Sequence, residues 1–285
     1  MDEILIRGGK RLAGDVRISG AKNSALPILA STILGGGECV ITNVPRVVDV
    51  LTMGKLLGIL GAKVSHEGNR AVIQVNAIES TEAPYDLVKT MRASVLVLGP
   101  LLARWGEAKV SLPGGCAIGS RPVNLHLAGL AKLGADISIE HGYITARAKR
   151  LRGERIYCDT PTVTGTENLM MAATLAEGVT TLENAAKEPE IVDLAEFLVK
   201  RGARIRGAGT DEIVIEGVGE LHGGDHEVIP DRIEAGTYLA AAAVTQGDVI
   251  ATHCRPGHLE AVLMKLREAG ADGLTELDTI LAKGY

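Results

Sequence analysis

The stretch Leu57-Gly-Ile-Leu-Gly-Ala-Lys-Val64 joins the end of a helix-like run to the start of an apolar, strand-like run. Its Gly-Ala pair recurs in similar surroundings at spacings of 73, 68 and 68 residues, as Gly61-Ala62, Gly134-Ala135, Gly202-Ala203 and Gly270-Ala271. Self-similarity at a fixed period is typical of chains built from repeated structural units. The sequence therefore predicts a fold made of repeats of about 70 residues.

Two further markers keep the same period. A glycine precedes a short β-like run in every repeat, at Gly37, Gly106, Gly178 and Gly247. A proline follows each of these runs, at Pro45, Pro113, Pro189 and Pro256. Each repeat therefore reads as helix, glycine, strand, proline, second helix, Gly-Ala and a closing pair of strands, with boundaries near residues 21, 88, 162 and 230. In the second repeat the closing pair is predicted to turn at His141-Gly142.

The composition indicates how such repeats pack. Hydrophobic residues make up 46% of the chain but aromatic residues only 2%, and there are 35 glycines. The core must therefore consist of Val, Ile, Leu and Ala that pack closely with the help of glycine. The first helix of a repeat is rich in small residues, as in 235–243, which lets neighbouring helices approach closely. This mixture predicts an α/β protein.

The fourth repeat differs from the others. Where they continue with a β-branched strand, it reads Asp272-Gly-Leu-Thr-Glu-Leu-Asp278. We therefore expect three whole repeats and a fragment. The preceding helix places Leu259, Val262, Leu263 and Leu266 on one face. That face is expected to lack a partner, so that this part of the chain either frays or associates with a second copy.

Charge and hydropathy exclude several classes of protein. The net charge of −5, with one Trp and one Phe, leaves neither a basic surface nor enough stacking side chains for nucleic acid. The acidic start Met1-Asp2-Glu3 is unlike a secretory signal. The longest apolar stretch, 93–103, is interrupted by Gly99-Pro100 and is too short to cross a membrane. A cytoplasmic protein without nucleic-acid or membrane partners is expected.

The cysteines and histidines do not suggest a metal. The four cysteines form no Cys-x-x-Cys pair, the seven histidines have no metal-ligand spacing, and phosphate-loop and Rossmann motifs are absent from the sequence. We therefore expect no zinc site, disulfide framework or bound cofactor. Cys39, Cys158 and Cys254 lie in apolar strand-like runs, where a cysteine usually acts as a small buried hydrophobe.

Cys116 has a different setting. It lies in the glycine-rich loop Ser111-Leu-Pro-Gly-Gly-Cys-Ala-Ile-Gly-Ser-Arg-Pro122, between a predicted strand and a predicted helix. Glycines allow backbone N–H groups to crowd around an anion. Arg121 and the start of the following helix would both favour the thiolate. The loop is thus either an anion site with a reactive cysteine or a structural turn that contains a small hydrophobe.

Two other helix starts carry cations. Lys22 and Asn23 follow Ser19-Gly20 at the start of the first helix, a position suited to a phosphate or a carboxylate. Arg92 lies near the start of another apolar helix. A solvated surface lysine or arginine is the ordinary alternative at both places. Together these residues predict an anion-binding site with three cations, Lys22, Arg92 and Arg121, beside the cysteine of the glycine-rich loop.

The same residues lie in four stretches that resemble the UDP-N-acetylglucosamine enolpyruvyl transferases. The stretches are Ile18-Ser-Gly-Ala-Lys-Asn-Ser-Ala-Leu-Pro27, residues 83–94, residues 112–123 and Pro230-Asp-Arg-Ile-Glu-Ala-Gly-Thr237. The resemblance extends from residue 1 to about residue 272. It implies a fold of two inside-out α/β barrel domains, each with three of these repeats.

On this resemblance, residues 22–229 form one complete domain. Residues 1–21 and 230–285 form an incomplete second domain with one repeat of three. The family's catalytic aspartate and further substrate-binding arginines would lie in the part that the 285 residues do not include. Little or no turnover is therefore expected of this chain.

The implied reaction transfers the enolpyruvyl group of phosphoenolpyruvate to the 3-hydroxyl of UDP-N-acetylglucosamine and releases phosphate. It belongs to peptidoglycan precursor synthesis, and so to cell-wall biogenesis, cell shape and cell division. The resemblance makes Cys116 the acid and covalent partner of phosphoenolpyruvate. It implies that the anionic groups of phosphoenolpyruvate bind to Lys22, Arg92 and Arg121. It assigns the sugar hydroxyl to Asn23. The nucleotide-sugar site would be lined by Arg121, Pro122, Val123, Asn124, Leu125, Thr162, Val163 and Gly165.

Two alternatives remain open. A sister transferase acts on shikimate 3-phosphate with the same fold, but its signature lacks the cysteine loop at residues 113–119. The other alternative is an inactive fragment that only binds the UDP-sugar. Phosphate release distinguishes them, because a binding protein shows affinity without turnover.

Overall fold

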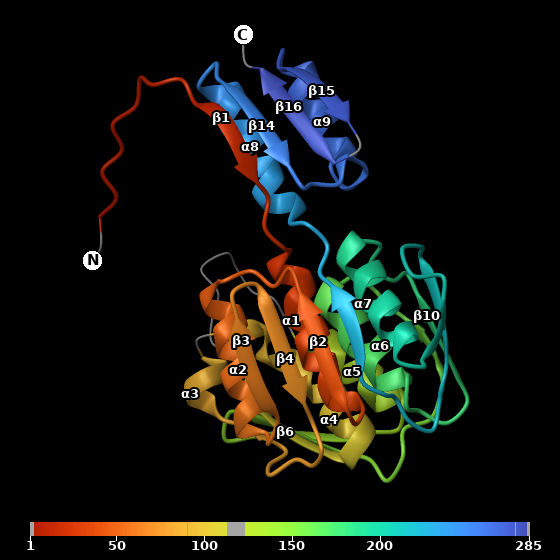
Figure 1. The fold of residues 1–285 in the computed structure, drawn as a ribbon. Coiled ribbons are helices and arrows are strands. Elements are labelled where there is room, and N and C mark those ends of the chain that lie inside the picture. The colour runs from red at the N-terminus through yellow and green to blue at the C-terminus, as the bar shows by residue number, and fades with distance from the viewer. Residues whose placement is uncertain (1–2, 90, 113–122, 277, 284–285) are drawn as a thin grey trace. The chain divides into compact units, whose positions relative to one another are not determined.

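A computed structural model describes residues 3–89, 91–112, 123–276 and 278–283 of the 285-residue chain (Figure 1). The chain divides into two compact units. We call Lys22–Ile229 the large unit, and Met1–Ala21 with Pro230–Tyr285 the small unit. None of the helices in the described ranges is long and apolar enough to cross a membrane.

The first repeat of the large unit follows the predicted order. It consists of α1 (Lys22–Ser31), the 3-10 turn η1 (Thr32–Leu34), β2 (Glu38–Thr42), α2 (Val48–Ile59), β3 (Lys63–Glu67) and β4 (Arg70–Gln74). The second consists of β5 (Glu82–Ala83), α3 (Tyr85–Val88), η2 (Arg92–Val97), α4 (Leu98–Trp105), β6 (Glu107–Ser111), α5 (Asn124–Lys132), β7 (Asp136–Glu140) and β8 (Tyr143–Arg147). His141 and Gly142 have φ of 50° and 80° between β7 and β8, which confirms the predicted turn.

The third repeat closes the large unit. It consists of β9 (Arg155–Tyr157), α6 (Val163–Ala173), β10 (Val179–Glu183), α7 (Pro189–Lys200), β11 (Arg204–Arg206), β12 (Glu212–Glu216) and β13 (Gly224–Glu227). The small unit contains the fourth repeat. It consists of β1 (Ala13–Arg17), α8 (Arg232–Val244), β14 (Asp248–Thr252), η3 (Pro256–His258), α9 (Glu260–Glu268), β15 (Asp272–Glu276) and β16 (Thr279–Lys283).

Each repeat forms a four-stranded sheet of the same design. The strand orders are β13-β2-β4-β3, β5-β6-β8-β7, β9-β10-β12-β11 and β1-β14-β16-β15. The first strand of each order pairs in parallel with the second, whereas the other pairs are antiparallel. By the boundaries predicted from the sequence, near residues 21, 88, 162 and 230, this parallel edge strand lies outside the repeat whose sheet it joins, although β5, β9 and β1 are grouped above with that repeat. Because β13 pairs with β2, the end of the third repeat completes the sheet of the first.

Helices α1, α5 and α6 lie inside the large unit, with β2–β4, β6 and β10 placed around them (Figure 1). Residues 24–31 of α1 and 165–173 of α6 are all buried. Strands such as β2 and β10 bury alternate residues, as expected when one face of a sheet covers helices. The predicted α/β fold class is confirmed, with the inside-out arrangement that the resemblance implied.

Close approach of the inner helices depends on small residues. A Cβ atom at Gly99 of α4 would lie 2.3 Å from Oδ1 of Asn168 on α6, a separation that real side chains do not reach. The Gly99 amide instead donates to that same oxygen at 2.7 Å. Glycine is therefore required here because the α4 backbone contacts a polar side chain of α6 directly.

The backbone shows the repeat as well. Asn43, Asn184 and His253, which directly follow β2, β10 and β14, have φ of 53°, 54° and 55°. Asparagine adopts this left-handed conformation more readily than most residues. Nδ2 of Asn43 donates to the Val228 carbonyl at 2.8 Å, and Nδ2 of Asn184 donates to the Cys158 carbonyl at 2.7 Å. Each asparagine follows the second strand of its sheet, and its side chain binds the residue that follows the parallel edge strand: Val228 after β13, and Cys158 after β9.

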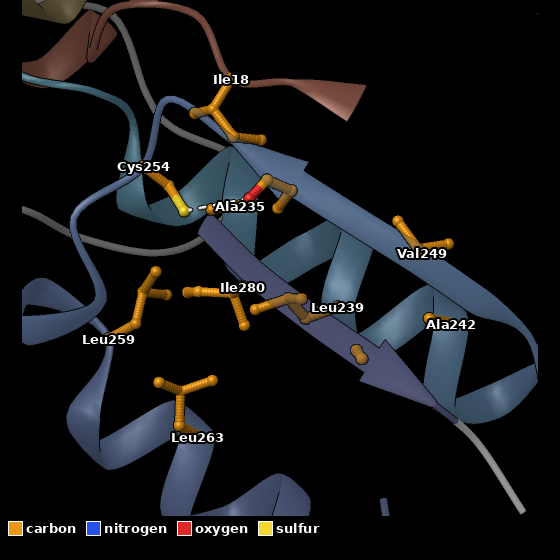
Figure 2. Close-up of a cluster of buried hydrophobic side chains, with 11 residues drawn as sticks. Ile18, Ala235, Leu239, Ala242, Val249, Cys254, Leu259, Leu263 and Ile280 are labelled. Carbon is orange, nitrogen blue, oxygen red and sulfur yellow. Dashed lines mark hydrogen bonds between the residues drawn. The ribbon is translucent and has the colours of Figure 1, made fainter. Parts of the chain in front are cut away.

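The small unit has a core of its own, shown in Figure 2. It is formed by buried residues of the N-terminal segment, α8, β14, α9 and β16, namely Ile18, Ala235, Leu239, Ala242, Val249, Ala251, Cys254, Leu259, Leu263, Ile280 and Ala282. The Cys254 thiol donates to the Ala251 carbonyl at 3.4 Å inside this cluster.

Two expectations about the fourth repeat were wrong. It is not a fragment, because β15 and β16 form the closing antiparallel pair. Nor does the face of α9 lack a partner. Leu259 and Leu263 are only 3% and 7% exposed, since β16 and α8 supply the apolar surface beside them, and Leu266 packs against the same cluster. Of the four residues of this face, Val262 remains the most exposed, at 40%.

Helix α8 carries exposed apolar side chains of the small unit, as do the N-terminal segment at Ile4, Leu5 and Ile6 and α9 at Met264. Ile233 and Val244 are 52% and 84% exposed. The equivalent inner helices of the large unit, α1 and α6, bury nearly all their side chains. Helix α8 therefore has one face in the core of Figure 2, with Ala235, Leu239 and Ala242 buried, and exposes Ile233 and Val244 on another face.

Candidate functional site

The helix starts of the large unit gather because of its parallel strand pairs. The carboxyl ends of parallel neighbours lie at the same edge of a sheet. Tyr157 of β9 is the register partner of Glu183 of β10. Strand β9 is followed by α6, and strand β10 is followed by α7. The pairs β5–β6 and β13–β2 meet in the same way. Each repeat thus delivers its loops and its helix starts to one edge.

Lys22 begins α1 at this edge. Its Nζ lies 3.3 Å from Oδ2 of Asp49, in the first turn of α2, and the two side chains are 43% and 34% exposed. Asn23 is exposed beside it. A half-exposed ammonium at a helix start remains accessible to an anion, and an exposed ion pair of this kind is held only weakly.

His126 connects three of the predicted segments. It lies in the first turn of α5, two residues after Asn124, and its side chain is buried. Its Nε2 is 3.3 Å from Oγ1 of Thr164, and its Nδ1 is 3.1 Å from Nδ2 of Asn168, both on α6. The charge of Arg92, at the start of η2, acts on the same imidazole. The starts of η2, α5 and α6 therefore meet at one histidine.

The hydrogen bonds keep this imidazole neutral. The Gly99 amide donates to Oδ1 of Asn168, which leaves Nδ2 of that amide as the donor to the Val95 carbonyl and to Nδ1 of His126. Nδ1 must therefore accept, and the ring proton is on Nε2, facing Thr164. Burial, followed by the charge of Arg92, lowers the pKa of His126 from 6.5 to about 4.

Thr162, Val163 and Gly165 form the start of α6. Thr162 is the N-cap residue, and its Oγ1 accepts from the Gly165 amide at 3.3 Å. A Cβ atom at residue 165 would lie 2.3 Å from Cγ2 of Thr162, so the cap requires glycine at that position. The next residue, Thr164, contacts His126, and this contact places the predicted segment beside the start of α5.

The predicted cysteine loop is described only at its ends. Cys116, Arg121 and Pro122 lie outside the described residues. β6 ends at Ser111, and Val123 precedes α5, whose first residues are Asn124 and Leu125. The structure thus brings Arg92, 123–125 and 162–165 together around His126, and it places Lys22 and Asn23 at the start of α1.

One depression of the large unit lies among other residues. It has a volume of about 1100 Å³, and it is lined by residues at the carboxyl ends of inner helices, such as Leu34, Trp105 and Leu175. Arg104 donates there to the carbonyls of Ile33 and Gly35, both at 2.8 Å, and so caps a helix end. None of the predicted site residues within the described ranges lines it, and we locate the site at the helix starts on chemical grounds.

The three other cysteines have the environments expected of structural residues. Cys39, Cys158 and Cys254 are buried. Burial raises the pKa of each thiol above its ordinary value. A raised pKa lowers the thiolate fraction at neutral pH, and the thiolate is the nucleophile. These side chains should therefore react slowly in the folded protein.

Glu167 is a buried acid that the sequence did not identify. It lies on α6, is 1% exposed, and its Oε1 has no hydrogen-bond partner among the described residues. Burial, and then the charges of Glu190 and Glu188, raise the pKa of this carboxyl well above its ordinary range. A protonated carboxyl is the form that such a site tolerates.

We predict that Glu167→Gln stabilises the protein at neutral pH. The folded-state pKa exceeds the unfolded value of about 4.5. The stability that the buried proton contributes is therefore fully present below the unfolded pKa. It is lost as the pH rises through the folded-state pKa. The melting temperature of the wild type should therefore fall more between pH 5 and pH 8 than that of the variant. Glu196→Gln, an exposed change on α7, is the control; equal pH dependence in all three proteins would contradict the prediction.

His126, Asn168 and Glu167 were all missed by the sequence reasoning. Each is a polar residue within a small-residue or apolar helix, and that was the available signal. The sequence could not show that His126 and Asn168, 42 residues apart, are hydrogen-bond partners.

Comparisons with known proteins agree with this fold. A family model described as EPSP synthase (3-phosphoshikimate 1-carboxyvinyltransferase) matches residues 6–284. A UDP-N-acetylglucosamine 1-carboxyvinyltransferase from Geotalea uraniireducens is 57% identical over 284 residues, which are 100% of this chain and 68% of the relative.

Solved structures give the same result. The enolpyruvyl transferase NikO from Streptomyces tendae superposes with a TM-score of 0.85 at 26% identity, over 98% of this chain and 67% of that one. An EPSP synthase from Acinetobacter baumannii superposes with a TM-score of 0.75 over 97% of this chain and 66% of that one. Its 20% identity supports similarity of fold alone.

Proposed function

Because the chain belongs to the EPSP synthase (3-phosphoshikimate 1-carboxyvinyltransferase) family of enolpyruvyl transferases, we propose that it binds phosphoenolpyruvate and UDP-N-acetylglucosamine. The proposed reaction is transfer of the enolpyruvyl group to the sugar 3-hydroxyl in peptidoglycan precursor synthesis. The observation that carries the proposal is the high identity to the Geotalea relative over the whole chain. A cytoplasmic location and a part in cell shape and division belong to the same proposal.

The proposed chemistry needs an acid and several cations. A proton adds to the vinyl CH₂ carbon of phosphoenolpyruvate, and the sugar 3-hydroxyl oxygen bonds to the neighbouring carbon. The hydroxyl loses its proton as this bond forms, and the resulting tetrahedral intermediate then loses a proton from its methyl group together with its phosphate to leave the enolpyruvyl ether. Cys116 is proposed as the acid and as the covalent partner of phosphoenolpyruvate. Lys22, Arg92 and Arg121 are proposed to neutralise the phosphate and carboxylate charges.

The nucleotide-sugar is proposed to bind along the starts of α5 and α6. The residues assigned to it are Arg121, Pro122, Val123, Asn124, Leu125, Thr162, Val163 and Gly165. His126 supports this assignment, because it holds the first turn of α5 against Thr164 and Asn168. Asn23, exposed at the start of α1, is proposed to orient the sugar hydroxyl.

Calorimetric titration tests the proposed ligands. UDP-N-acetylglucosamine should bind, whereas shikimate 3-phosphate should not. Lys22→Gln should weaken binding of phosphoenolpyruvate by about tenfold or more, because a hydrogen bond to a charged group is lost. Lys63→Gln, an exposed change on β3, is the matched control. Binding of shikimate 3-phosphate in preference to the UDP-sugar would contradict the proposal and favour the sister reaction.

We also predict that Cys116 reacts faster with iodoacetamide than the other three thiols. The pKa values of Cys39, Cys158 and Cys254 are raised by burial, whereas Cys116 has a glycine-rich sequence and a nearby arginine. Labelling of the folded protein followed by peptide mapping measures the four rates. The assignment fails if any of the three buried cysteines is modified first.

Self-association through the small unit is the last part of the proposal. The exposed face of α8 contains Ile233 and Val244, and the burial of α1 and α6 shows that this type of helix packs on both sides in a three-repeat unit. Val244→Asp should therefore shift the protein towards monomer in light scattering. Val48→Asp, on an exposed valine of α2, should not. A wild type that is monomeric at every concentration tested would contradict this prediction.

A further inference from the structure

The chain passes between its two units at residues 21/22 and 229/230. On the small-unit side the two passages are paired. Gly20 and Pro230 form a β-bridge, and the Asp231 amide donates to the Ser19 carbonyl at 2.8 Å. The segment that leads into α1 therefore runs beside the segment that leaves the large unit.

On the large-unit side a single carboxylate holds both segments. Asp193 lies on α7, and its side chain is 1% exposed. Its Oδ2 accepts from the hydroxyl of Ser24 on α1 and from the amide of Ile229 at 3.3 Å. Its Oδ1 is 2.8 Å from Nε2 of His226 on β13. Ser24 is two residues from Lys22, and Ile229 is the last residue of the large unit.

The histidine is itself held from the other side. Nζ of Lys200 lies 3.2 Å from Nδ1 of His226, and the ring of Phe197 packs against the imidazole at a centroid distance of 5.3 Å. Because an ammonium can only donate, Nδ1 accepts, and the Nε2 proton is donated to Asp193. A neutral imidazole therefore joins one buried carboxylate to one ammonium. The carboxylate has three donors, which is what a buried charge requires.

We propose that Asp193 is a positioning residue for the anion site, because it fixes the first turn of α1 relative to the segment that ends at Ile229. Through Ser24 it sets the orientation of Lys22 and Asn23, and it touches no substrate itself. The inference rests on the proposed function in assigning Lys22 to a substrate anion. A buried ion is a costly way to fill a core, since apolar residues of similar volume often serve as well or better. The Asp193 carboxylate binds both Ser24 and Ile229, which lie beside the two points where the chain leaves the large unit, and this placement indicates a positioning role.

Helix α1 offers a matched pair of variants. Ser24 and Ser31 are both fully buried on this helix. Ser24 binds Asp193, whereas the Ser31 hydroxyl donates to the Ile28 carbonyl within its own helix. Ser24→Ala and Ser31→Ala therefore make the same chemical change at the two ends of one helix. Asp193→Asn removes the charge and replaces an acceptor oxygen with a donor, which cannot satisfy Ser24, Ile229 and His226 together.

The first readout is amide hydrogen exchange, which does not depend on any ligand. The Ile229 amide donates to Asp193, whereas the adjacent Val228 amide donates to the Thr42 carbonyl at 3.1 Å. In Asp193→Asn, Ile229 should exchange about tenfold faster or more, with Val228 little changed. Equal acceleration of both amides would show general destabilisation and would overturn the proposal.

The second readout is the dissociation constant of phosphoenolpyruvate at a temperature where every variant is folded. It should rise by about tenfold in Asp193→Asn, rise measurably in Ser24→Ala and stay within about twofold in Ser31→Ala. Variants that melt at lower temperature but bind like the wild type would overturn the positioning role. If the wild type binds neither phosphoenolpyruvate nor UDP-N-acetylglucosamine, the proposed function fails, and the exchange of Ile229 against Val228 alone decides whether Asp193 fixes these segments.

Discussion

Supplied with phosphoenolpyruvate and UDP-N-acetylglucosamine, the 285-residue polypeptide is expected to release phosphate at least about 10²–10³-fold more slowly than a full-length relative. It spans 68% of the length of the Geotalea transferase. By the resemblance described above, a catalytic aspartate and further arginines come from the part of such a relative that these 285 residues do not include. Loss of one preorganised charge-stabilising group alone costs about that factor, and the resemblance implies that several are involved.

The control is the full-length relative assayed under the same conditions. A second arm adds the remaining third of that relative as a separate polypeptide. Rescue of turnover by this addition would show that the large unit already carries a competent half of the site. Steady turnover by the 285-residue polypeptide alone, at a rate near that of the relative, would contradict the prediction.

The second large effect is a loss of stability in mild acid, caused by His126. Its pKa is about 4 when folded and 6.5 in its ordinary state, because burial and Arg92 oppose the charged form. Between these values the unfolded chain binds the proton and the folded protein does not. Stability is therefore fully present above pH 6.5 and falls as the pH drops towards 4, by about 3 kcal/mol in all.

Urea unfolding at several pH values between 4 and 7 measures this change. His126→Phe should remove most of the slope, although it lowers stability at pH 7 because Nδ2 of Asn168 loses one of its two acceptors and keeps only the Val95 carbonyl. His141→Asn is the matched control, since His141 is exposed and its left-handed backbone accepts asparagine. A wild-type slope that persists in His126→Phe would show that other groups cause the acid sensitivity.

His126 also explains how the site is built. One neutral imidazole joins α5 to α6, and Arg92 lies within range of its charge. Protonation would direct a second N–H at the Asn168 amide nitrogen, which is already a donor. The same pH range that lowers stability should therefore also loosen the starts of α5 and α6, where the nucleotide-sugar is proposed to bind.

The cation positions were accessible from the sequence because helix starts can be recognised locally. A small polar or glycine residue before an apolar run marks the start, and such a start attracts anions. Lys22 and Arg92 were identified in this way, and the structure places both at helix starts. Asp193 and His226 gave no comparable signal, since a charged residue within a helix and a histidine in a short strand are usually solvated.

The sequence by itself determined the order of elements, because that order depends on neighbours in the chain. The period of the Gly-Ala pairs predicted four repeats, and the turn at His141-Gly142 requires only two adjacent residues with positive φ. The inner helices followed from runs of small and apolar residues. Hydrophobic periodicity and turn chemistry act over a few residues, so these features can be read without a fold.

Tertiary structure alone decided the sheet edges, the burial of α9 and the polar clusters. β13 pairs with β2 at Glu227↔Thr42, and Ser24 meets Asp193 across 169 residues. Strands as short as β5, with two residues, have no periodicity to detect, and their partners are fixed only when the repeats pack around the inner helices. Hydrogen bonds between distant residues form because packing brings the groups together and burial removes water as the competing partner.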